Sequence, residues 1–406
     1  MKIVIDCTIS QTKPHSGVGQ YVKNLVTEMI RSADERTEFI LLLFNETTTI
    51  SDETLNSNKV KVHRIANNIG KYGNKLRRLF PYRLVFDRVI NDIAESEQQF
   101  IYFCPFFTNG FPVDTPKVAT VVTIHDFAMP AFNYYSDKGF LVNTLRRYQY
   151  WWHLKKTTRC EAVIVISDHT KEDYKRYFPD FPIDQIHKTY LGVELDVYEN
   201  VDISVYLPSD YQERGYFIYM GGGIQKNKNS LGVIKAYSDF VKSFEATSSN
   251  NQPPYLVIAG KIFENTNLPE MKRLKDLIEE LSLIEHVHFT GFYPDESKYL
   301  LLKHSIAFIH LSLYEGFGIA VGEAMKAGIP VIAHDGTSYP EVVGDTGFLV
   351  DGRNSEEVSE TMLQIYRNPE SALVKARVAQ KRIEQFSWTN TAQKTLQVFS
   401  DLWQDL

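Results

Sequence analysis

The sequence is poor in cysteine, and it has no apolar run long enough to cross a bilayer. Its three cysteines, Cys7, Cys104 and Cys160, are odd in number and have no metal-ligand spacing, which argues against a disulfide framework and a zinc site. A reducing, cytoplasmic setting is the simplest interpretation of this cysteine usage. The apolar segment Lys2–Ile5 begins directly after the first residue, so we expect no secretory signal peptide.

The sequence also lacks a strong charge of either sign, internal repeats and low-complexity segments. A formal net charge of −6 over 406 residues gives no overall attraction to nucleic acid or anionic lipid, so we expect no nucleic-acid partner. A hydrophobic content of 43% is enough to bury two ordinary cores in a chain of this length. Alternating strand and helix patterns predict an α/β fold with parallel sheets.

The first half of the chain has apolar runs typical of buried strands, with helical patterns between them. The predicted strands are Lys2–Ile5, Phe39–Leu43, Val60–Ile65, Ile101–Phe103, Val118–Ile124 and Ala162–Ile166. The predicted helices are Gln20–Ile30, Leu76–Glu95, Lys138–Arg159 and His169–Tyr177. The glycine-rich segment Ser10–Gly19 is predicted to be a loop.

A linker is predicted at Glu194–Gly215, where no clear periodicity exists. A second strand and helix alternation follows it. Its predicted strands are Tyr216–Met220, Leu256–Ala259, Val287–Thr290, Ile306–Leu311, Val331–Ala333 and Phe348–Val350. The final segment, Trp388–Leu406, has the apolar spacing of a helix.

The segment Leu313–Pro330 is the most informative part of the sequence. It places Glu315 and Glu323 on either side of seven residues, three of which are glycine. A predicted strand precedes it, and a helical pattern that stops at Gly328 follows its glycine turn, Gly316–Gly318. The first amides of such a helix have no partner within the helix, so they form a binding site for an anionic group.

The two glutamates add acceptors for sugar hydroxyls beside this anion site, which indicates a nucleotide-sugar site. A second interpretation stays open at this point. Glycines at such a turn often serve only the turn, and a glutamate in the first helical turn is often only a favourable partner of the helix dipole.

The longer segment Leu313–Asp351 closely resembles the donor-site signature of retaining glycosyltransferases of family 4, which have the two-domain GT-B fold. The signature consists of a glutamate, seven residues and a second glutamate. A buried strand follows, here Val331–Ala333, and then a glycine-containing loop and a Pro-Glu pair, here Pro340 and Glu341. The resemblance implies an enzyme that transfers a hexose from a nucleotide diphosphate sugar with retention of configuration.

The resemblance also implies the domain organisation. Two Rossmann-like domains face a central cleft: residues 1–200 bind the acceptor, and residues 201–386 bind the nucleotide sugar. The terminal helix, residues 387–406, crosses back to the first domain.

By resemblance to this family, we expect Glu315 to hold hydroxyls of the transferred sugar and Glu323 to bind the ribose. By the same resemblance the diphosphate lies at the turn and first helical residues, which are Gly316, Phe317, Gly318, Ile319 and Ala320. We expect the donor substrate to bind without a cofactor or a metal ion. No Asp-x-Asp motif, which would indicate a metal site, lies at a predicted strand end.

A second glycine-rich turn, Gly221–Asn229, opens the carboxyl-terminal half. Backbone amides of such a turn and the basic side chains after it can hold a diphosphate. By resemblance Lys228 contacts the diphosphate, and Gly222 and Gly223 belong to the donor site. Many family members have an arginine where this sequence has Gly223, and Lys226 or Lys261 could replace its charge.

In the first half, the resemblance makes Gly17 and Gly19 donor-site candidates. His125 ends a strongly apolar strand, at the end of the sheet where α/β proteins place ligand groups. The family has a His-Asp pair here whose histidine reaches the transferred sugar, so His125 is a catalytic candidate together with Glu315 and Lys228. Asp126 is a weaker candidate, and the Ser167–His169 turn is interpreted chiefly as a helix cap.

The sugar itself does not follow from the sequence. General similarity to bacterial mannosyl- and rhamnosyltransferases of surface polysaccharide assembly favours a GDP- or dTDP-linked donor and a saccharide or lipid-linked acceptor. Two alternatives are a GT-B enzyme of another type, such as an epimerase or phosphorylase, and a non-catalytic nucleotide-sugar-binding scaffold.

Two basic segments that contain aromatic residues, 71–88 and 146–159, complete the motifs. One interpretation is a helix with a buried aromatic side and a solvated basic side. The other is peripheral docking on an anionic membrane face, as in family members with lipid-linked acceptors.

Overall fold

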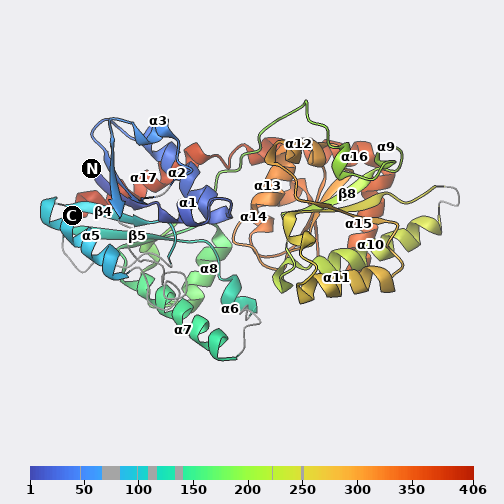
Figure 1. Ribbon diagram of the computed structural model, residues 1–406, viewed down its shortest axis with the longest axis horizontal. Coiled ribbons are helices and arrows are strands. Elements are labelled where there is room, and N and C mark those ends of the chain that lie inside the picture. Colours follow the sequence, from blue (N-terminus) through green and yellow to red (C-terminus); the bar gives the residue numbers. More distant parts are fainter. Residues whose placement is uncertain are drawn as a thin grey trace. The chain divides into compact units, whose positions relative to one another are not determined.

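The computed structural model describes residues 1–45, 47–65, 83–97, 99–107, 117–132, 140–221, 223–247 and 251–406. The chain forms two compact units (Figure 1). The amino-terminal unit combines Met1–Gly192 with Phe386–Leu406, and the carboxyl-terminal unit is Val193–Gln385. The chain therefore passes from one unit to the other twice.

The amino-terminal unit contains a seven-stranded sheet in which every described pair of neighbouring strands is parallel. Apolar β-branched and aromatic residues make these strands suited to burial on both faces of a sheet. In spatial order the strands are β3 (Val60–Ile65), β2 (Glu38–Phe44), β1 (Lys2–Asp6), β4 (Phe100–Cys104), β5 (Val118–Ile124), β6 (Ala162–Val165) and β7 (Ile186–Lys188).

The helices of this unit include the last long helix of the chain. They are α1 (Thr8–Thr12), α2 (Gly17–Ser32), α3 (Asp52–Leu55), α5 (Arg83–Ser96), α6 (Ala128–Phe132), α7 (Phe140–Lys156), α8 (Asp168–Tyr177) and α17 (Trp388–Asp405). Ser387 caps α17 by accepting a hydrogen bond from the Asn390 amide. Helix α17 packs against α2 and β4, and its Phe399 ring lies 5.1 Å from that of Phe103. This confirms that the terminal helix returns to the first unit.

The carboxyl-terminal unit contains a six-stranded sheet whose described strand pairs are all parallel. The order is β10 (Val287–Gly291), β9 (Tyr255–Ala259), β8 (Tyr216–Met220), β11 (Ala307–His310), β12 (Val331–His334) and β13 (Phe348–Val350). Its helices are α9 (Tyr211–Arg214), α10 (Ser230–Glu245), α11 (Pro269–Glu280), α12 (Asp295–Lys303), α13 (Ile319–Lys326), α14 (Tyr339–Val343), α15 (Ser355–Arg367) and α16 (Pro369–Ile383). The two parallel sheets confirm the predicted α/β class.

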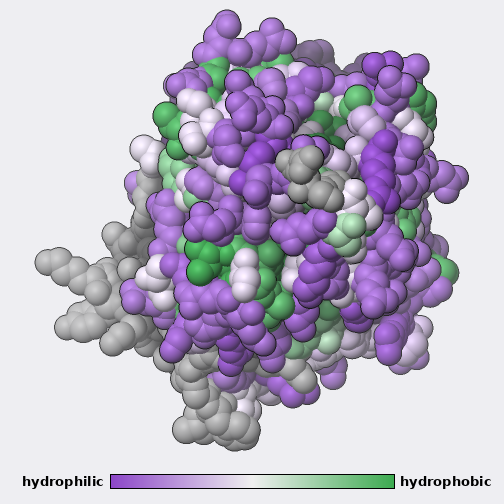
Figure 2. Space-filling model, turned by 90° about the vertical axis from the view of Figure 1, so that its right-hand side faces the viewer, coloured by the Kyte–Doolittle hydropathy of each residue, from purple (hydrophilic) through white to green (hydrophobic). Residues whose placement is uncertain are grey.

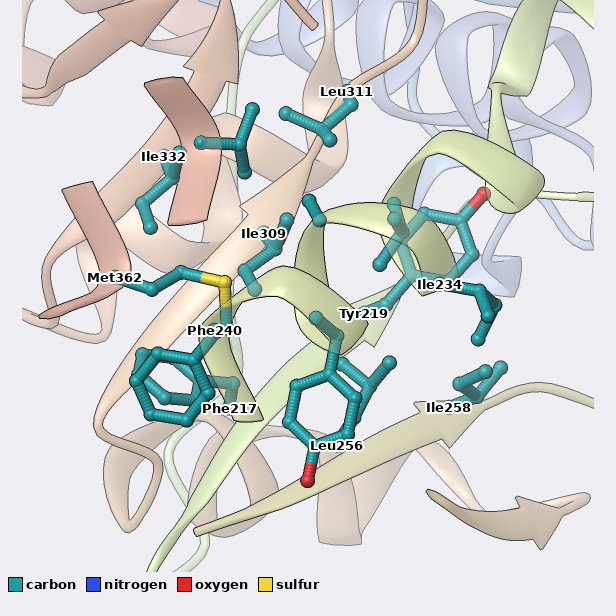
Figure 3. Close-up of a cluster of buried hydrophobic side chains, with 14 of the residues drawn as sticks. Phe217, Tyr219, Ile234, Phe240, Leu256, Ile258, Ile309, Leu311, Ile332 and Met362 are labelled. Carbon is teal, nitrogen blue, oxygen red and sulfur yellow. The ribbon is translucent and has the colours of Figure 1, made fainter. Parts of the chain in front are cut away.

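A hydrophobic core fills the space between this sheet and the helices α10, α11 and α15 (Figures 1 and 3). Phe217 and Ile309 from the sheet, Phe240 from α10 and Met362 from α15 are among its fully buried members. Helix α13 packs with α16 rather than with these three helices. One face of the molecule is mostly hydrophilic, with hydrophobic residues only in small separate patches (Figure 2).

The structure differs from the predicted elements at a few places. The predicted loop Ser10–Gly19 overlaps the short helix α1, where Asp6 accepts hydrogen bonds from the amide and hydroxyl of Thr8. Strand β7 was not predicted. The predicted linker Glu194–Gly215 contains two short helical turns, at Ser204–Tyr206 and in α9. The beginning of the helix predicted at Leu76 lies outside the described residues.

No helix among the described residues is long and apolar enough to cross a membrane. All three cysteines are buried, and none of them forms a disulfide in the described structure. They therefore act as small hydrophobic side chains of the core.

Candidate functional site

The strand order of the carboxyl-terminal sheet reverses between β8 and β11. From β8 the chain proceeds outward to β9 and β10, and from β11 it proceeds the other way to β12 and β13. In open parallel sheets, ligands bind outside the carboxyl ends of the strands at such a reversal. The two turns predicted to bind the donor, Gly221–Asn229 and Leu313–Ala320, directly follow these two strands.

Lys228 and Glu315 form an ion pair at this edge of the sheet. The Lys228 Nζ atom lies 2.5 Å from Oε1 of Glu315, although 87 residues separate them in the sequence. The side chains remain 23% and 17% exposed, respectively. Burial raises the pKa of Glu315, but the Lys228 ammonium, together with His310 and Ser312, holds that pKa below its usual value. Glu315 is therefore a carboxylate at neutral pH.

Hydrogen bonds tie the Lys228 turn to the segment after β11. The carbonyl oxygen of Asn227 accepts hydrogen bonds from the Leu313 amide at 2.7 Å and from Ser312 Oγ at 2.9 Å. Asn229 adopts a left-handed backbone with φ of 54°. Its side-chain amide donates to the carbonyl oxygens of Leu311 and Gly352. The two turns therefore form one rigid unit.

Glycine is required at the turn that begins α13. Gly318 has φ of +94°, and a Cβ atom there would lie 2.5 Å from the ring of Tyr339. In the opposite turn Gly221 has φ of +68°, and a Cβ atom would lie 2.7 Å from the Cβ of Ala320. The close approach of both turns places backbone, rather than side chains, at the start of α13. Helix geometry gives the amides of Ile319 and Ala320 no acceptor within the helix.

The backbone of Glu315 is fixed from the loop after β12. Its amide donates to Thr337 Oγ1 at 3.3 Å, and its carbonyl oxygen accepts from Ser338 Oγ at 3.1 Å. Gly316 and Phe317 follow as buried residues. The turn is thus held on both sides before the helix begins.

Glu323 lies on α13, and it also forms an ion pair with a lysine. Lys298 Nζ on α12 lies 3.0 Å from its Oε1 atom. Burial raises the pKa of Glu323, and Lys298 opposes this rise only in part. The start of α13 is therefore flanked by two carboxylates, each with its own ammonium partner.

The remaining candidates of this unit lie in less informative surroundings. Gly223 is buried, whereas Gly222 lies outside the described residues. Lys226 is exposed on the Lys228 turn. Lys261 follows β9, and its Nζ atom lies 5.8 Å from the centre of the exposed Phe292 ring. In the described chain, no contact joins Lys226 or Lys261 to the Lys228–Glu315 pair. The proposal that Lys226 or Lys261 replaces the charge of the family's arginine stays a prediction.

Sequence reasoning missed several side chains that shape the site. They are Asn227, Lys298, His310, Thr337 and Tyr339. Their sequence positions carry no common motif, because each reaches the site from a different element. The position of His310 at the end of β11 is the one signal that could have been used.

In the amino-terminal unit, His125 lies at the carboxyl end of β5. It is 8% exposed, and neither ring nitrogen has a hydrogen-bond partner among the described residues. Burial lowers its pKa to about 3, so the ring is neutral at physiological pH. The Tyr21 ring packs against it edge-on, with ring centres 4.7 Å apart, and the Phe106 ring lies 6.0 Å away. A buried imidazole without partners is costly unless it binds a further molecule.

Gly17 and Gly19, predicted to lie in a loop, are in the first turn of α2 and differ in their surroundings. A Cβ atom on Gly19 would lie 2.1 Å from the carbonyl oxygen of Lys13, whereas Gly17 has open space around it. Asp126 accepts a hydrogen bond from the Ala128 amide, and Ser167 accepts one from the Thr170 amide. Ser167 therefore caps α8, as predicted, and Asp126 binds the first amide of α6.

The second basic segment, 146–159, lies in α7 and the turn after it. Trp151 packs edge-on against Tyr177 within the unit, and Lys156 lies over the Trp152 ring at 3.8 Å. Tyr148 is 71% exposed. Most of the segment 71–88 lies outside the described residues. Membrane docking by either segment stays a prediction.

No cluster of three or more His, Cys, Asp or Glu side chains suited to a metal ion exists within the described ranges. The polar groups at the β8–β11 edge are instead an ammonium, carboxylates and backbone amides. They can bind a phosphate group and sugar hydroxyls at the same place.

Comparisons with known proteins concern the family and the fold of the chain. A family model described as glycosyl transferases group 1 matches residues 209–382. The chain is 26% identical over 399 residues to the O-antigen chain mannosyltransferase B of Escherichia coli, which covers 95% of this chain and 96% of that protein.

Two solved structures resemble the whole chain. Sucrose-phosphate synthase from Thermosynechococcus elongatus has a TM-score of 0.70 at 16% identity and covers 100% of both chains. Anabaena HepE in complex with UDP and glucose has a TM-score of 0.66 at 18% identity and covers 99% of this chain and 100% of that chain. At these identities the likeness establishes the fold. Residues 209–382 therefore match the group 1 glycosyl transferases, and the chain has the two-domain GT-B fold that the resemblance to family 4 glycosyltransferases predicts.

Proposed function

We propose that the chain transfers a hexose from a nucleotide diphosphate sugar to a hydroxyl of a saccharide or lipid-linked saccharide during surface polysaccharide synthesis. The observation that carries this proposal is the Lys228–Glu315 pair beside the start of α13. Mannose is favoured over rhamnose because the relative that matches 95% of the chain is a mannosyltransferase. In this proposal the carboxyl-terminal unit binds the donor and the amino-terminal unit binds the acceptor.

The geometry of the carboxyl-terminal unit suits the departure of a nucleoside diphosphate. As the glycosidic bond breaks, negative charge grows on the diphosphate. The amides at the start of α13 and the Lys228 ammonium provide preformed positive charge for it. The Glu315 carboxylate then accepts hydrogen bonds from hydroxyls of the transferred sugar. We expect this set of groups to bind the donor without a divalent cation.

His125 has a different role in this proposal. A neutral imidazole can donate one hydrogen bond and accept another. Neither nitrogen has a partner among the described residues, so both are available to a sugar hydroxyl. We propose that His125 binds the transferred hexose.

The first test is a thermal-shift titration with GDP, UDP, dTDP and ADP, first without metal and then with magnesium. A ligand that binds only the folded protein raises its melting temperature. We expect one nucleotide to stabilise the protein without metal. A protein that no nucleotide stabilises, with or without magnesium, would contradict the proposal.

Transfer is tested with GDP-mannose and oligosaccharide acceptors. Glu315→Gln should lower kcat/KM by about 10- to 100-fold, since a hydrogen bond to a charged group contributes roughly 1.5–3 kcal/mol. Asp345→Asn is the matched control, because Asp345 is an exposed carboxylate of the same unit. Equal loss in both variants would argue against a specific role of Glu315.

A non-catalytic nucleotide-sugar-binding scaffold is the second candidate. It would bind nucleotide in the titration but show neither transfer nor hydrolysis of the donor. The buried, unpartnered imidazole of His125 speaks against it, because a scaffold that binds only at the carboxyl-terminal unit has no use for that group.

A further inference from the structure

Lys298 is a lysine outside the predicted donor-site motifs, yet it lies against one of their two carboxylates. It projects from α12, which precedes β11, whereas its partner Glu323 lies on α13, which follows β11. The Nζ–Oε1 distance is 3.0 Å, and the side chains are 22% and 16% exposed, respectively. An ion pair withdrawn from water to this degree fixes both side chains more firmly than an exposed pair does.

The ionisation of the Glu323 carboxyl group depends on Lys298, as the groups around the pair show. Asp295 Oδ1 lies 3.7 Å from the same Nζ atom but is 85% exposed. The half-buried Tyr293 has a raised pKa, chiefly through burial and further through Glu323 and Asp295. Burial raises the pKa of Glu323, while Lys298 lowers it. Without Lys298, the Glu323 carboxyl would therefore take up a proton at a higher pH.

The Glu323 carboxylate also has unused acceptor capacity. An ionised carboxylate offers about four acceptor positions, and Lys298 occupies one of them on Oε1. Within the described part of the chain, no other side chain or amide donates to this carboxylate. The remaining positions suit a pair of neighbouring hydroxyl groups.

We propose that Lys298 is a positioning residue of the donor site, which fixes the Glu323 carboxylate to accept hydrogen bonds from both hydroxyls of a ribose and so favours ribonucleoside over 2′-deoxyribonucleoside diphosphates. This inference rests on the proposed function, because it takes the nucleotide to bind at α13. A site built to bind a hydroxyl rejects the analogue that lacks it, since its own polar group is then left unpaired. Lys298 thus favours donors that carry a ribose, such as GDP- or UDP-linked sugars, over dTDP-linked sugars.

The test compares four proteins by calorimetric binding of GDP, 2′-deoxy-GDP, UDP and 2′-deoxy-UDP. The proteins are wild type, Lys298→Met, Lys298→Arg and the control Lys303→Met, which changes an exposed lysine of the same helix. For the base that binds, wild type and Lys303→Met should prefer the ribonucleotide by about 10-fold or more. Lys298→Met should lose most of this preference, and Lys298→Arg should keep it.

A pH series separates positioning from general damage to the fold. As the pH is lowered, the affinity of Lys298→Met for the ribonucleotide should begin to fall at a higher pH than that of wild type, because Glu323 then takes up its proton more readily. In the Glu323→Gln background the Lys298→Met change should cost little further affinity, because its partner is already neutral. This double variant also avoids an unpaired buried carboxylate, so it tests the proposal even where Lys298→Met alone does not fold.

The measurements separate a failure of the proposed function from a failure of the role of Lys298. A wild-type protein that binds no nucleotide contradicts the proposed function itself. A wild-type protein that binds ribo- and deoxyribonucleotides equally, or a Lys298→Met protein that keeps the preference, overturns the role of Lys298 alone. Equal losses from Lys298→Met in the wild-type and Glu323→Gln backgrounds also overturn it.

Discussion

The Nδ1 atom of His310 lies 2.6 Å from the hydroxyl oxygen of Tyr339, and both side chains are buried. This hydrogen bond joins the end of β11 to the start of α14. The Tyr339 ring that this bond holds lies so close to Gly318 that a Cβ atom at position 318 would not fit. The turn that begins α13 therefore rests on a ring that a buried histidine keeps in place.

Tyr339→Phe should destabilise the carboxyl-terminal unit by about 1–3 kcal/mol, because it leaves a buried histidine nitrogen without its partner. It should also weaken nucleotide binding, since the ring supports the Gly318 turn. Differential scanning calorimetry and GDP titration measure the two effects. Tyr366→Phe is the control: Tyr366 is half-buried, and no described hydrogen bond involves its hydroxyl. A Tyr339→Phe protein as stable as this control would show that the hydrogen bond adds no stability.

Lys228→Ala should lower kcat/KM for the donor by about 10- to 100-fold, because it removes the ammonium that faces Glu315 and the proposed diphosphate. Lys226→Ala is the matched control two residues earlier in the same turn. Because the Lys226 side chain is exposed, this change should lower kcat/KM by less than about 3-fold. Steady-state kinetics with GDP-mannose decide between them. A larger effect at Lys226 would assign the missing arginine's role to that residue.

Gly19→Ala should destabilise the amino-terminal unit by about 1–3 kcal/mol, since its new methyl group would collide with the Lys13 carbonyl oxygen. Gly17→Ala, with open space around it, should be neutral or stabilising by up to about 1 kcal/mol. Urea unfolding followed by tryptophan fluorescence reports on this unit alone, because all four tryptophans lie in it. Similar midpoints for the two variants would contradict the packing described for Gly19.

His125 should make the amino-terminal unit sensitive to acid. Its pKa is about 3 in the folded protein, against 6.5 for an unperturbed histidine. Below pH 6.5 the unfolded chain therefore binds a proton that the folded chain does not, and stability falls as the pH falls towards 3. At pH 5 this amounts to about 2 kcal/mol.

His125→Leu should remove this part of the acid sensitivity. Tryptophan-monitored unfolding of both proteins between pH 7 and pH 4.5 measures the difference, to which the other histidines contribute equally in both. A proton NMR signal of His125 that titrated near pH 6.5 would refute the expected behaviour.

The strand, glycine turn and helix around Glu315 could be predicted from the sequence because their signals are local. An apolar run, a Gly-Phe-Gly turn and a periodic helix that ends at Gly328 all lie within 23 residues, 306–328. The backbone agrees: α13 covers Ile319–Lys326, and Gly328 has φ of +71°. Local signals of the same kind predicted that Lys228 follows a strand and a glycine-rich turn.

The partners of these residues could not be predicted, because they meet only once the sheet has formed. Lys298 and Glu323 are 25 residues apart, and His310 and Tyr339 are 29 residues apart. Neither separation falls within one helix or strand. Helix α1 escaped prediction for another reason. Its threonines and serine favour turns over helices, and the Asp6 side chain stabilises its start.

The return of α17 to the amino-terminal unit has a consequence for the order in which the protein is made. A ribosome completes Val193–Gln385 before it adds the last 21 residues of this chain, Phe386–Leu406. Until then, Phe103 and the surface of α2 lack their covering helix. The unit whose synthesis begins first is thus the last to be finished, and the carboxyl-terminal unit can fold while its neighbour still awaits a part.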